Sequence, residues 1–284
     1  MSWIRIDDTA GWMEKLKALV EPQETSCMET VALLTGAKEQ SRSPVAHKSG
    51  DAIDAVLFFA SYGRIIPVLS PQFLFHQEDV RYVSALAGNA VFLPTSVSGR
   101  TEAVDMFLER FSCGQREQAV EHYIMELNKD NFHPEPIPDK SRIKILRGSM
   151  RHLLPLLPLQ RTYEIQEVLL DPDSIDTAET FRWLKSILTQ EICFYARCGF
   201  RYVAKANTNC RGFSHIQIGG VFTKGEFRRK GYGYHTVSAL CSYIIDKEHK
   251  IPSLFVKQDN INAINLYRKL GFEIKDTIKT VYLD

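Results

Sequence analysis

The sequence predicts an α+β protein built from two domains, and three observations support this. The chain has 284 residues, of which 44% are hydrophobic and 24% charged, enough for two cores of roughly 100–150 residues each. Strand-like and helix-like patterns occur in both halves. Between them, NKDNFHPEPIPDKS at 128–141 combines prolines with charges and excludes a regular element. We therefore expect a smaller α+β domain at 1–130, a Pro-rich linker at 131–141 and a second domain at 142–284.

Apolar patterns in the first half predict both helices and strands. Its expected elements are a helix at MEKLKALVE (13–21), two strands turning near Gly63 in AIDAVLFFASYGRIIPVLS (52–70), a strand at NAVFLPTS (89–96) and a helix at TEAVDMFLERF (101–111).

The second half predicts the order β-α-α-β-β-β-α-β-α-β-β. The segments are, in this order, IKILR, SMRHLLPLLPLQRTYEIQEVL, TAETFRWLKSILTQE, ICFYARC, FRYVAKANT, HIQIGGVFT, YGYHTVSALCSYIIDKE, PSLFVKQ, NAINLYRKLGF, EIKDT and KTVYLD.

Charge and composition exclude several functional classes. Thirty-five basic and 34 acidic residues give a net charge of +1, so no global field attracts nucleic acid or an anionic membrane. The N-terminus lacks a signal-peptide core, and no apolar run approaches the ~20 residues of a membrane span. The six cysteines form no CxxC and the eight histidines no HxH or HExxH. We expect a cytoplasmic protein without a metal.

The loop TKGEFRRKGYGYHT, at 223–236, has the composition of an anion-binding turn. It follows a predicted strand, and its glycines Gly231 and Gly233 lie where a helix begins near Tyr232. Backbone N–H groups at the positive end of a helix suit a phosphate, and Arg228 can add charge-assisted hydrogen bonds. The spacing fits neither GxGxxG nor GxxxxGK[ST]. For the loop alone, a basic solvated turn remains the alternative.

A second segment, LFVKQDNINAINLYRKLGF, lies about thirty residues downstream. Together the two segments resemble the GNAT superfamily of acyl-CoA-dependent N-acyltransferases, over roughly residues 141–284. Arg228-Arg229-Lys230-Gly231-Tyr232-Gly233 is similar to the (Arg/Gln)-x-x-Gly-x-(Gly/Ala) signature of that family. The residues that match its Asn-x-x-Ala-x-x-Leu-Tyr-x-x-x-Gly-Phe run are Asn260, Ala263, Leu266, Tyr267, Gly271 and Phe272.

A looser resemblance reaches two-part bacterial GNAT proteins, through YEIQEV at Tyr163–Val168 and QIGGV at Gln217–Val221. It implies that the first half is a degenerate GNAT-like repeat. The strand-to-helix turn that we expect to correspond to the signature loop there is PTSVSGRTEA, whose single glycine is Gly99.

The resemblance implies a GNAT fold, with a mixed, mostly antiparallel sheet flanked by helices, and a site for acetyl-CoA. Gly219-Gly220 inside a strand predicts a bulge or a close backbone approach, with a simple twist as the alternative. Asn260 is either a helix N-cap or a pantetheine contact. The implied cofactor-binding residues are Val221, Thr223, Arg228, Arg229, Lys230, Gly231, Tyr232, Gly233, Tyr234 and Asn260.

The resemblance also assigns catalytic candidates. Tyr267 is the expected general acid for the departing thiolate, since a phenol is protonated at neutral pH; a core tyrosine is the alternative. The strand position that holds a carboxylate in many GNAT enzymes aligns with Gln217, which cannot accept a proton. Glu164 and Glu167 are the candidate bases, with His215 a further one. The two glutamates are three residues apart on one predicted helix face, and mutual repulsion would raise one pKa; a solvated acidic face is the alternative.

The predicted function is transfer of an acetyl group from acetyl-CoA to a primary amine of an unidentified acceptor. No cysteine lies in either motif, which favours direct transfer over a thioester relay. The alternative is a non-catalytic CoA-binding regulatory module, which Gln217 favours. Nucleic-acid binding ranks third because Arg228–Lys230 lacks a wider basic face.

Overall fold

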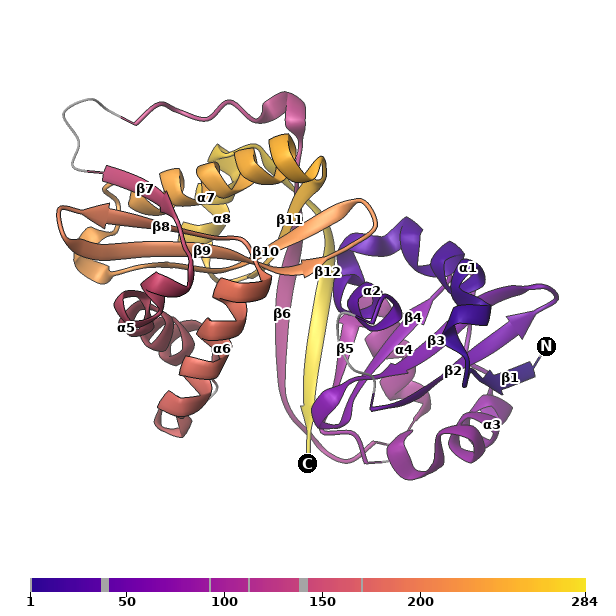
Figure 1. Ribbon diagram of the computed structural model, residues 1–284. Coiled ribbons are helices and arrows are strands. Elements are labelled where there is room, and N and C mark those ends of the chain that lie inside the picture. The colour runs from indigo at the N-terminus through magenta and orange to yellow at the C-terminus, as the bar shows by residue number, and fades with distance from the viewer. Residues whose placement is uncertain (1, 37–40, 92, 112, 138–142, 170) are drawn as a thin grey trace. The chain divides into compact units, whose positions relative to one another are not determined.

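The computed structural model describes residues 2–36, 41–91, 93–111, 113–137, 143–169 and 171–284 (Figure 1). The chain forms two compact units that interleave along the sequence. The first unit comprises Met1–Ile124, Val256–Asn260 and Ile274–Asp284, and the second comprises Met125–Phe255 and Ile261–Glu273. Both contain strands and helices, which confirms the predicted α+β class.

In the first unit, strands pair in the order β1-β2-β3-β4-β5-β12, antiparallel except for the β4–β5 pair. Its elements are β1 (Ser2–Arg5), α1 (Thr9–Val20), α2 (Met28–Leu34), β2 (Arg42–Ser49), β3 (Ala52–Phe59), β4 (Arg64–Leu69), α3 (Gln77–Ala87), β5 (Ser96–Arg100), α4 (Thr101–Arg110) and the end of β12 (Phe272–Leu283). Strand β6 (Arg116–Leu127) leads from this unit into the second.

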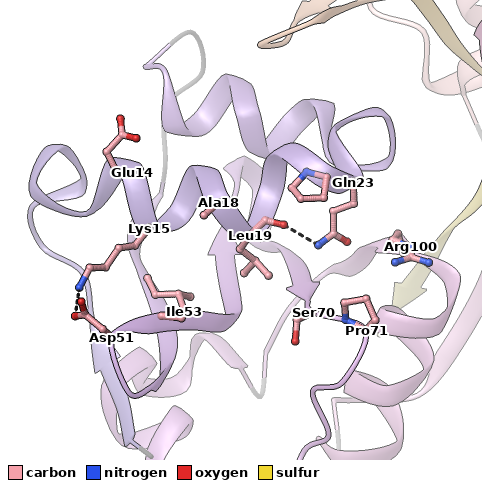
Figure 2. A pocket seen from close by; sticks show the side chains of 12 residues that line it. Glu14, Lys15, Ala18, Leu19, Gln23, Asp51, Ile53, Ser70, Pro71 and Arg100 are labelled. Atoms are coloured by element: carbon pink, nitrogen blue, oxygen red, sulfur yellow. Dashed lines mark hydrogen bonds and ion pairs between the residues drawn. The ribbon is translucent and has the colours of Figure 1, made fainter.

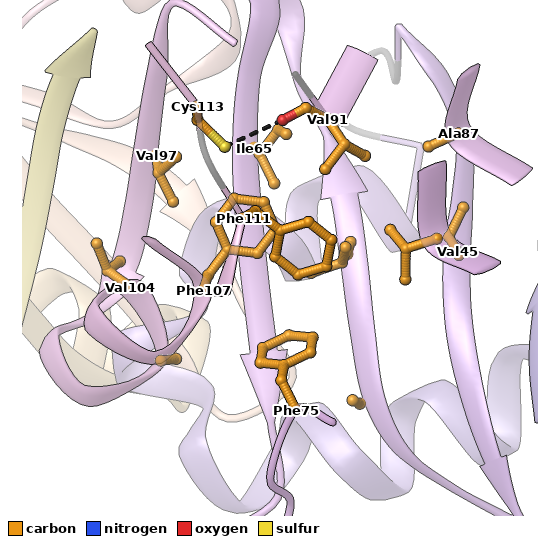
Figure 3. Packing of buried hydrophobic residues seen from close by; sticks show 14 of the residues in the cluster. Val45, Ile65, Phe75, Ala87, Val91, Val97, Val104, Phe107, Phe111 and Cys113 are labelled. Carbon is orange, nitrogen blue, oxygen red and sulfur yellow. Dashed lines mark hydrogen bonds between the residues drawn. The ribbon is translucent and has the colours of Figure 1, made fainter. Parts of the chain in front are cut away.

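A core of aromatic and aliphatic side chains holds the first unit together (Figure 3). Phe107 and Phe111, near the end of α4, are fully buried and stack with ring centroids 4.5 Å apart. Phe75 meets Phe111 edge-on at 5.3 Å. Val83 of α3 belongs to the same core. The amphipathic pattern of α4 therefore fixes this helix to the sheet.

The second unit contains strands in the order β11-β10-β9-β8-β7, antiparallel except for the β10–β11 pair. Helices α5 and α6 cover one face of its sheet and α7 and α8 the other (Figure 1). Its elements are β7 (Ile143–Arg147), α5 (Leu153–Tyr163) continued by a π-helical turn (Glu164–Val168), α6 (Thr177–Gln190), β8 (Cys193–Cys198), β9 (Arg201–Arg211), β10 (His215–Thr223), α7 (Tyr232–Tyr243), β11 (Ile251–Lys257) and α8 (Ile261–Lys269).

The two units share one topology. In each, a first strand is followed by two helices, three antiparallel strands, a crossover helix and a parallel strand. Thus β2-β3-β4-α3-β5 corresponds to β8-β9-β10-α7-β11. This order corrects one expectation. The turn PTSVSGRTEA contains β5 and the start of α4, so the true counterpart of the signature loop is Ser70–His76, between β4 and α3.

Several sequence expectations change in detail. Gly88–Val91 forms a 3-10 turn, and β5 begins only at Ser96, after Pro94, which cannot donate a hydrogen bond to a strand; Phe92 lies outside the described residues. The two closing strands form one strand, β12, with no turn between them. Helix α8 ends at Lys269. Strand β2 and helix α3 were not predicted.

The predicted linker is described only in part. Residues 132–137 form neither helix nor strand, and residues 138–141 lie outside the described residues. The domain limits at 1–130 and 142–284 stay a prediction.

Replacing Phe107 with alanine tests the first core. Removing a fully buried phenyl ring leaves a cavity, and we expect the free energy of unfolding to fall by about 3–5 kcal/mol. Tyr82 is 56% exposed on α3 of the same unit, and we expect Tyr82→Ala to change it by less than about 0.5 kcal/mol. Urea unfolding of both variants measures the difference, and equal effects would contradict the assigned core.

Candidate functional site

The signature loop joins β10 to α7 in a tight turn. Gly231 precedes the first residue of α7 with a φ of +83°, a left-handed conformation that favours glycine. Arg229 has a φ of +59°, so the turn is sharp at two positions. The N–H of His235 donates to the carbonyl of Gly231 at 3.0 Å and starts the helix. Gly233 lies in the first turn, next to Oγ1 of Thr223. The first N–H groups of a helix have no intrahelical partner, so a helix end of this kind suits an anion.

Three basic side chains surround this turn, and all three are exposed. Arg228 donates from Nε to the carbonyl of Thr223 at 3.0 Å and from a terminal nitrogen to Gln166 Oε1 at 3.2 Å. Lys230 donates to the carbonyl of Glu226 at 2.8 Å. These hydrogen bonds leave both cations at the surface of the loop, where they can contact a phosphate.

The tyrosine side chains of the loop point into the protein. Tyr232 is buried and meets Phe227 edge-on at 5.6 Å. The Tyr234 hydroxyl accepts a hydrogen bond from the Glu135 N–H at 3.2 Å, and Lys269 lies over the Tyr234 ring at 4.9 Å. Only the backbone of these two tyrosines can therefore face a ligand at the helix end, while their rings anchor α7.

A β-bulge interrupts β10 just before the loop. Between the pairs Gly219–Asn207 and Phe222–Lys205, strand β10 has two residues where β9 has one. Gly220 has a φ of +56°, and a Cβ there would lie 2.1 Å from Asn207 Oδ1. The predicted bulge is confirmed. The parallel pairing of β10 with β11 runs only from His215–Ile251 to Ile218–Leu254, so the partly exposed Val221 and Thr223 lie beyond it.

Three side chains hold the bulge from the face that carries α5. Lys205 is 1% exposed and donates from Nζ to the carbonyl of Gly220 at 3.0 Å and to Asn207 Oδ1 at 2.8 Å. Its ammonium lies 5.0 Å from the centre of the Tyr163 ring. Burial raises the pKa of Tyr163 to about 12, and a hydrogen bond with the backbone of Gly220 lowers it. The sequence interpretation missed Lys205 and Tyr163. The signal was a lysine among small and apolar residues in YVAKANT.

Tyr267 is buried in α8, and its ring meets Phe272 at 5.8 Å. Burial raises the pKa of its phenol well above the ordinary value, and the neighbouring ionisable groups Tyr163, Glu167 and Cys241 raise it further. Glu167 also raises the pKa of Tyr163. Two phenols and a partly exposed carboxylate thus lie near each other, and both phenols are protonated at neutral pH.

The two candidate glutamates have different surroundings. Glu164 is 5% exposed, and its carboxylate accepts hydrogen bonds from Gln160 at 2.7 Å and from the Thr180 hydroxyl. Glu167 is partly exposed. The sequence interpretation placed both on one α-helical face, but they lie in a π-helical turn closed by the Leu169 N–H on the Glu164 carbonyl at 2.9 Å. That wider turn separates their directions.

The remaining candidates lie on strands or at a helix start. Gln217 is 8% exposed on β10, opposite Ser253 of β11 and Cys210 of β9. His215 Nε2 lies 3.1 Å from Glu126 Oε2, a carboxylate partner that holds the imidazole. Asn260 directly precedes α8, and its N–H donates to the carbonyl of Lys257 at 3.0 Å.

The counterpart of the loop in the first unit is closed to a phosphate. Phe73 and Phe75 of the segment Ser70–His76 are buried against Trp3. The carboxylate of Asp79 caps α3 by accepting from the His76 N–H at 2.6 Å and also accepts from Trp3 Nε1 at 2.8 Å. A carboxylate already occupies the positive end of this helix, so it offers no site to a further anion.

A groove of about 710 Å³ remains in the first unit, beside α1 and at the ends of β4 and β5 (Figure 2). Three of its polar contacts involve groups of the first unit. Lys15 pairs with Asp51 at 2.6 Å, and Gln23 donates to the carbonyl of Leu19 at 3.0 Å. Arg100 pairs with Asp276 at 2.9 Å. The groove offers apolar walls, and Lys15, Asp51 and Arg100 on its rim each have a partner of opposite charge.

Comparisons with known proteins agree with this geometry. Residues 201–282 match the family model described as FR47-like protein. Over 105 residues, 35% of the chain, the sequence is 27% identical to an uncharacterised N-acetyltransferase of Methanocaldococcus jannaschii, and the match spans 46% of that protein. The chain therefore spans about half the length of this curated relative.

Two solved structures cover nearly the whole chain. A GNAT-family acetyltransferase from Colwellia psychrerythraea aligns over 100% of both chains, with a TM-score of 0.62 and 10% identity. A tandem GNAT protein from the clavulanic acid biosynthesis pathway aligns over 99% of this chain and 97% of its own, with a TM-score of 0.63 and 14% identity.

The fold and the loop define the class, which is that of GNAT-fold proteins. The second unit carries the loop that resembles the GNAT signature and most of the FR47-like match, and the first unit repeats the same order of strands and helices without that loop. In the described part of the chain, no helix is long and apolar enough to span a membrane. Among the same residues, no three His, Cys, Asp or Glu side chains gather as metal ligands would.

The buried ammonium of Lys205 gives stability a pH dependence. Burial lowers its pKa from 10.5 to about 8. Between these values the unfolded chain binds more protons here than the native chain, so this group makes the free energy of unfolding rise with pH. We expect the stability of the natural protein relative to Lys205→Met to rise from pH 8 to pH 10, by up to about 1.4 kcal/mol per unit.

Denaturant unfolding at pH 7, 8, 9 and 10 measures this difference. Lys144→Met, at an exposed position of β7, is the matched control and should show a pH-independent difference. A stability difference for Lys205→Met that stays flat or falls over this range would contradict the burial of a charged amine.

Proposed function

We propose that the second unit is an acetyl-CoA-dependent N-acetyltransferase that acts on a primary amine by direct transfer. The observation that carries this proposal is the continuity of one strand, β10, with both features that the reaction needs. Its bulge at Gly220 and Val221 sets backbone groups free from the sheet, and its end at Thr223 leads into the anion-binding turn before α7. Acetyl-CoA carries both a thioester and a pyrophosphate, so one molecule would contact the bulge through its thioester and the turn through its pyrophosphate.

The proposed cofactor site follows this strand. The N–H groups from Arg229 to Tyr234, with the Arg228 and Lys230 side chains, would hold the pyrophosphate. The backbone of Val221 and Thr223 would pair with the pantetheine arm, since it lies beyond the β10–β11 pairing. Asn260 would contact the arm or cap α8. When bound, acetyl-CoA supplies the activated acyl group and the thiolate leaving group.

The proposed chemistry uses groups from three elements. The Val221 N–H would donate to the thioester oxygen and stabilise the oxyanion that forms when the amine attacks. A new C–N bond forms, the C–S bond breaks, and Tyr267 would donate its proton to the thiolate. Glu167 would take the proton from the amine, directly or through a water molecule. Glu164 would position the π-helical turn, because Gln160 and Thr180 already bind its carboxylate.

The second candidate function is a CoA-binding regulatory protein without turnover. One observation favours it: Gln217, which cannot act as a base, lies at the strand position where many related enzymes carry a carboxylate. A protein that binds acetyl-CoA but acetylates none of a panel of amines, amino acids and peptides would support this reading.

Cofactor binding is tested by thermal stability. We expect CoA and acetyl-CoA each to raise Tm, because a ligand at one hundred times Kd stabilises the native state by about 2.7 kcal/mol, whereas NAD and ATP should not. Arg228→Gln should weaken CoA binding about tenfold, since a charge-assisted hydrogen bond contributes ~1.5 kcal/mol or more.

Arg182→Gln is the matched control, because Arg182 is an exposed arginine of α6 with a side chain 70% exposed. It should leave Kd for CoA unchanged. A protein whose Tm shifts with neither CoA species would disprove the proposed cofactor site.

The acid role is tested by Tyr267→Phe. Removing the only hydroxyl of this side chain should lower kcat by about 10²–10⁴-fold while Kd for CoA stays within threefold. Tyr243→Phe is the control, because the Tyr243 hydroxyl only accepts a hydrogen bond from Arg147 in the described residues, at 2.9 Å. Steady-state kinetics with the best acceptor of the panel gives both constants. Unchanged kcat in Tyr267→Phe would remove the assigned role.

The base is tested by comparing two substitutions of similar size. Glu167→Gln should lower kcat/KM for the amine and abolish the part of the pH profile that reports this carboxylate. Glu164→Gln should act mainly on Tm, since it changes a buried hydrogen-bond network. If Glu164→Gln is the variant that alters the pH profile, the two roles are reversed.

A further inference from the structure

The second unit contains a fully buried lysine that the chemistry above does not use. Lys205 lies on β9, opposite Phe222 of β10, at the downstream end of the bulge. Its hydrogen-bond acceptors in the described part of the chain, the Gly220 carbonyl and Asn207 Oδ1, are both neutral. A buried ammonium is unfavourable unless it is well compensated. Because burying this ammonium costs free energy, we asked which function its position could serve.

The position of the ammonium is specific to the bulge. A Cβ added to Gly220 would lie 2.7 Å from Nζ of Lys205, so the amine fills the space that the missing side chain leaves. The Gly220 carbonyl that it binds belongs to the peptide group that contains the Val221 N–H. Holding this carbonyl therefore fixes the direction of the next N–H, because the two groups share one planar peptide.

The surroundings of Lys205 come from four further elements. Tyr163 of α5 presents its ring at 5.0 Å. The buried thiol of Cys193 on β8 and the carboxylate of Glu164 in the π-helical turn both favour the charged form of the amine. Gly220 of β10 and Asn207 of β9 itself provide the hydrogen-bond acceptors. The amine thus has one fixed location, with an aromatic face on one side and the bulge on the other.

We propose that Lys205 is a positioning residue that holds the Gly220–Val221 peptide so that the Val221 N–H meets the thioester oxygen. Its charge, bound to the opposite end of that peptide, polarises the N–H and favours negative charge on the oxygen. This inference rests on the proposed acetyltransferase function. Gly219 and Gly220 permit the bulge, and Lys205 fixes the direction of its peptide group.

The test compares Lys205→Met with the natural protein and with Lys144→Met. Methionine fills the space of the lysine stem without its charge. We expect Kd for CoA to stay within threefold, because the pyrophosphate turn is untouched, and kcat to fall at least tenfold; one missing oxyanion donor can cost 10²–10³-fold. Lys144→Met should behave like the natural protein in both measurements.

A second readout isolates the carbonyl contact. Isothermal titration with CoA and with acetyl-CoA gives the ratio of the two Kd values. This ratio depends on contacts with the thioester oxygen, whereas contacts with the pyrophosphate are common to both ligands and cancel. We expect Lys205→Met to reduce any preference for acetyl-CoA by at least threefold. If the variant is folded and its kcat lies within tenfold of the natural value, the proposal is overturned.

The natural protein offers a test that needs no variant, should Lys205→Met fail to fold. The ammonium loses its proton near pH 8, whereas the buried Tyr163 and Tyr267 stay protonated to much higher pH. We expect kcat at saturating substrates to fall at least threefold between pH 7.5 and pH 9.5. A kcat that is constant or rises refutes the proposal. A natural protein that binds neither CoA nor acetyl-CoA refutes the proposed function and this inference with it. A natural protein that binds CoA but shows no fall in kcat refutes this inference alone.

Discussion

The β-bulge at Gly220 and Val221 is the feature on which the site in the second unit depends. A regular strand would pair both edges of its backbone with β9 and β11, and it would offer nothing to a ligand. The extra residue makes β10 irregular just after its pairing with β11 ends at Ile218. The strand then continues to Thr223, where the turn into α7 begins. One local irregularity therefore connects an open strand edge to a helix end.

The two repeats show what this irregularity contributes. Both units have the same order of strands and helices, and in both the parallel pairing is short, with Arg64–Ser96 and Ile65–Val97 in the first unit. The first unit fills the corresponding region with Phe73 and Phe75 and caps its helix with Asp79. The two buried phenyl rings stabilise the core, and the carboxylate stabilises the start of α3. The same side chains occupy the helix end where a phosphate would bind.

The sequence predicted the elements of the second unit well because its signals are local. Strand β10 was predicted at its full length of His215–Thr223, and the Gly219-Gly220 pair indicated the bulge. The pattern could not show which side chains fill the space beneath that bulge. Lys205 is 15 residues from Gly220 in the chain, and their contact depends on the register of two strands. Only a structure supplies that register.

The first unit was harder to predict for a related reason. Arg42–Ser49 forms a central strand although it contains Pro44, and propensity argues against a strand at such a position. The final residues of the chain pair with β5 rather than with their sequence neighbours, a long-range choice that no periodicity encodes. The counterpart of the signature loop was predicted at the turn that contains Gly99. The order of strands, which places it at Ser70–His76, was not known from the sequence.

The location of the base in our proposal follows from the location of the bulge. A strand-borne carboxylate at the position of Gln217 would lie on a residue that is 8% exposed, paired on both sides and upstream of the bulge at Gly220 and Val221. Besides Lys205 and Asn207 of β9, side chains of α5 and its π-helical extension approach the bulged part of β10, as Tyr163 does at Gly220. The π turn adds one residue before the helix closes, and this sends Glu164 toward Thr180 and leaves Glu167 partly exposed near two phenols. A helix that widens at this point can deliver both a structural carboxylate and a reactive one within four residues, so a glutamine on the strand does not by itself exclude catalysis.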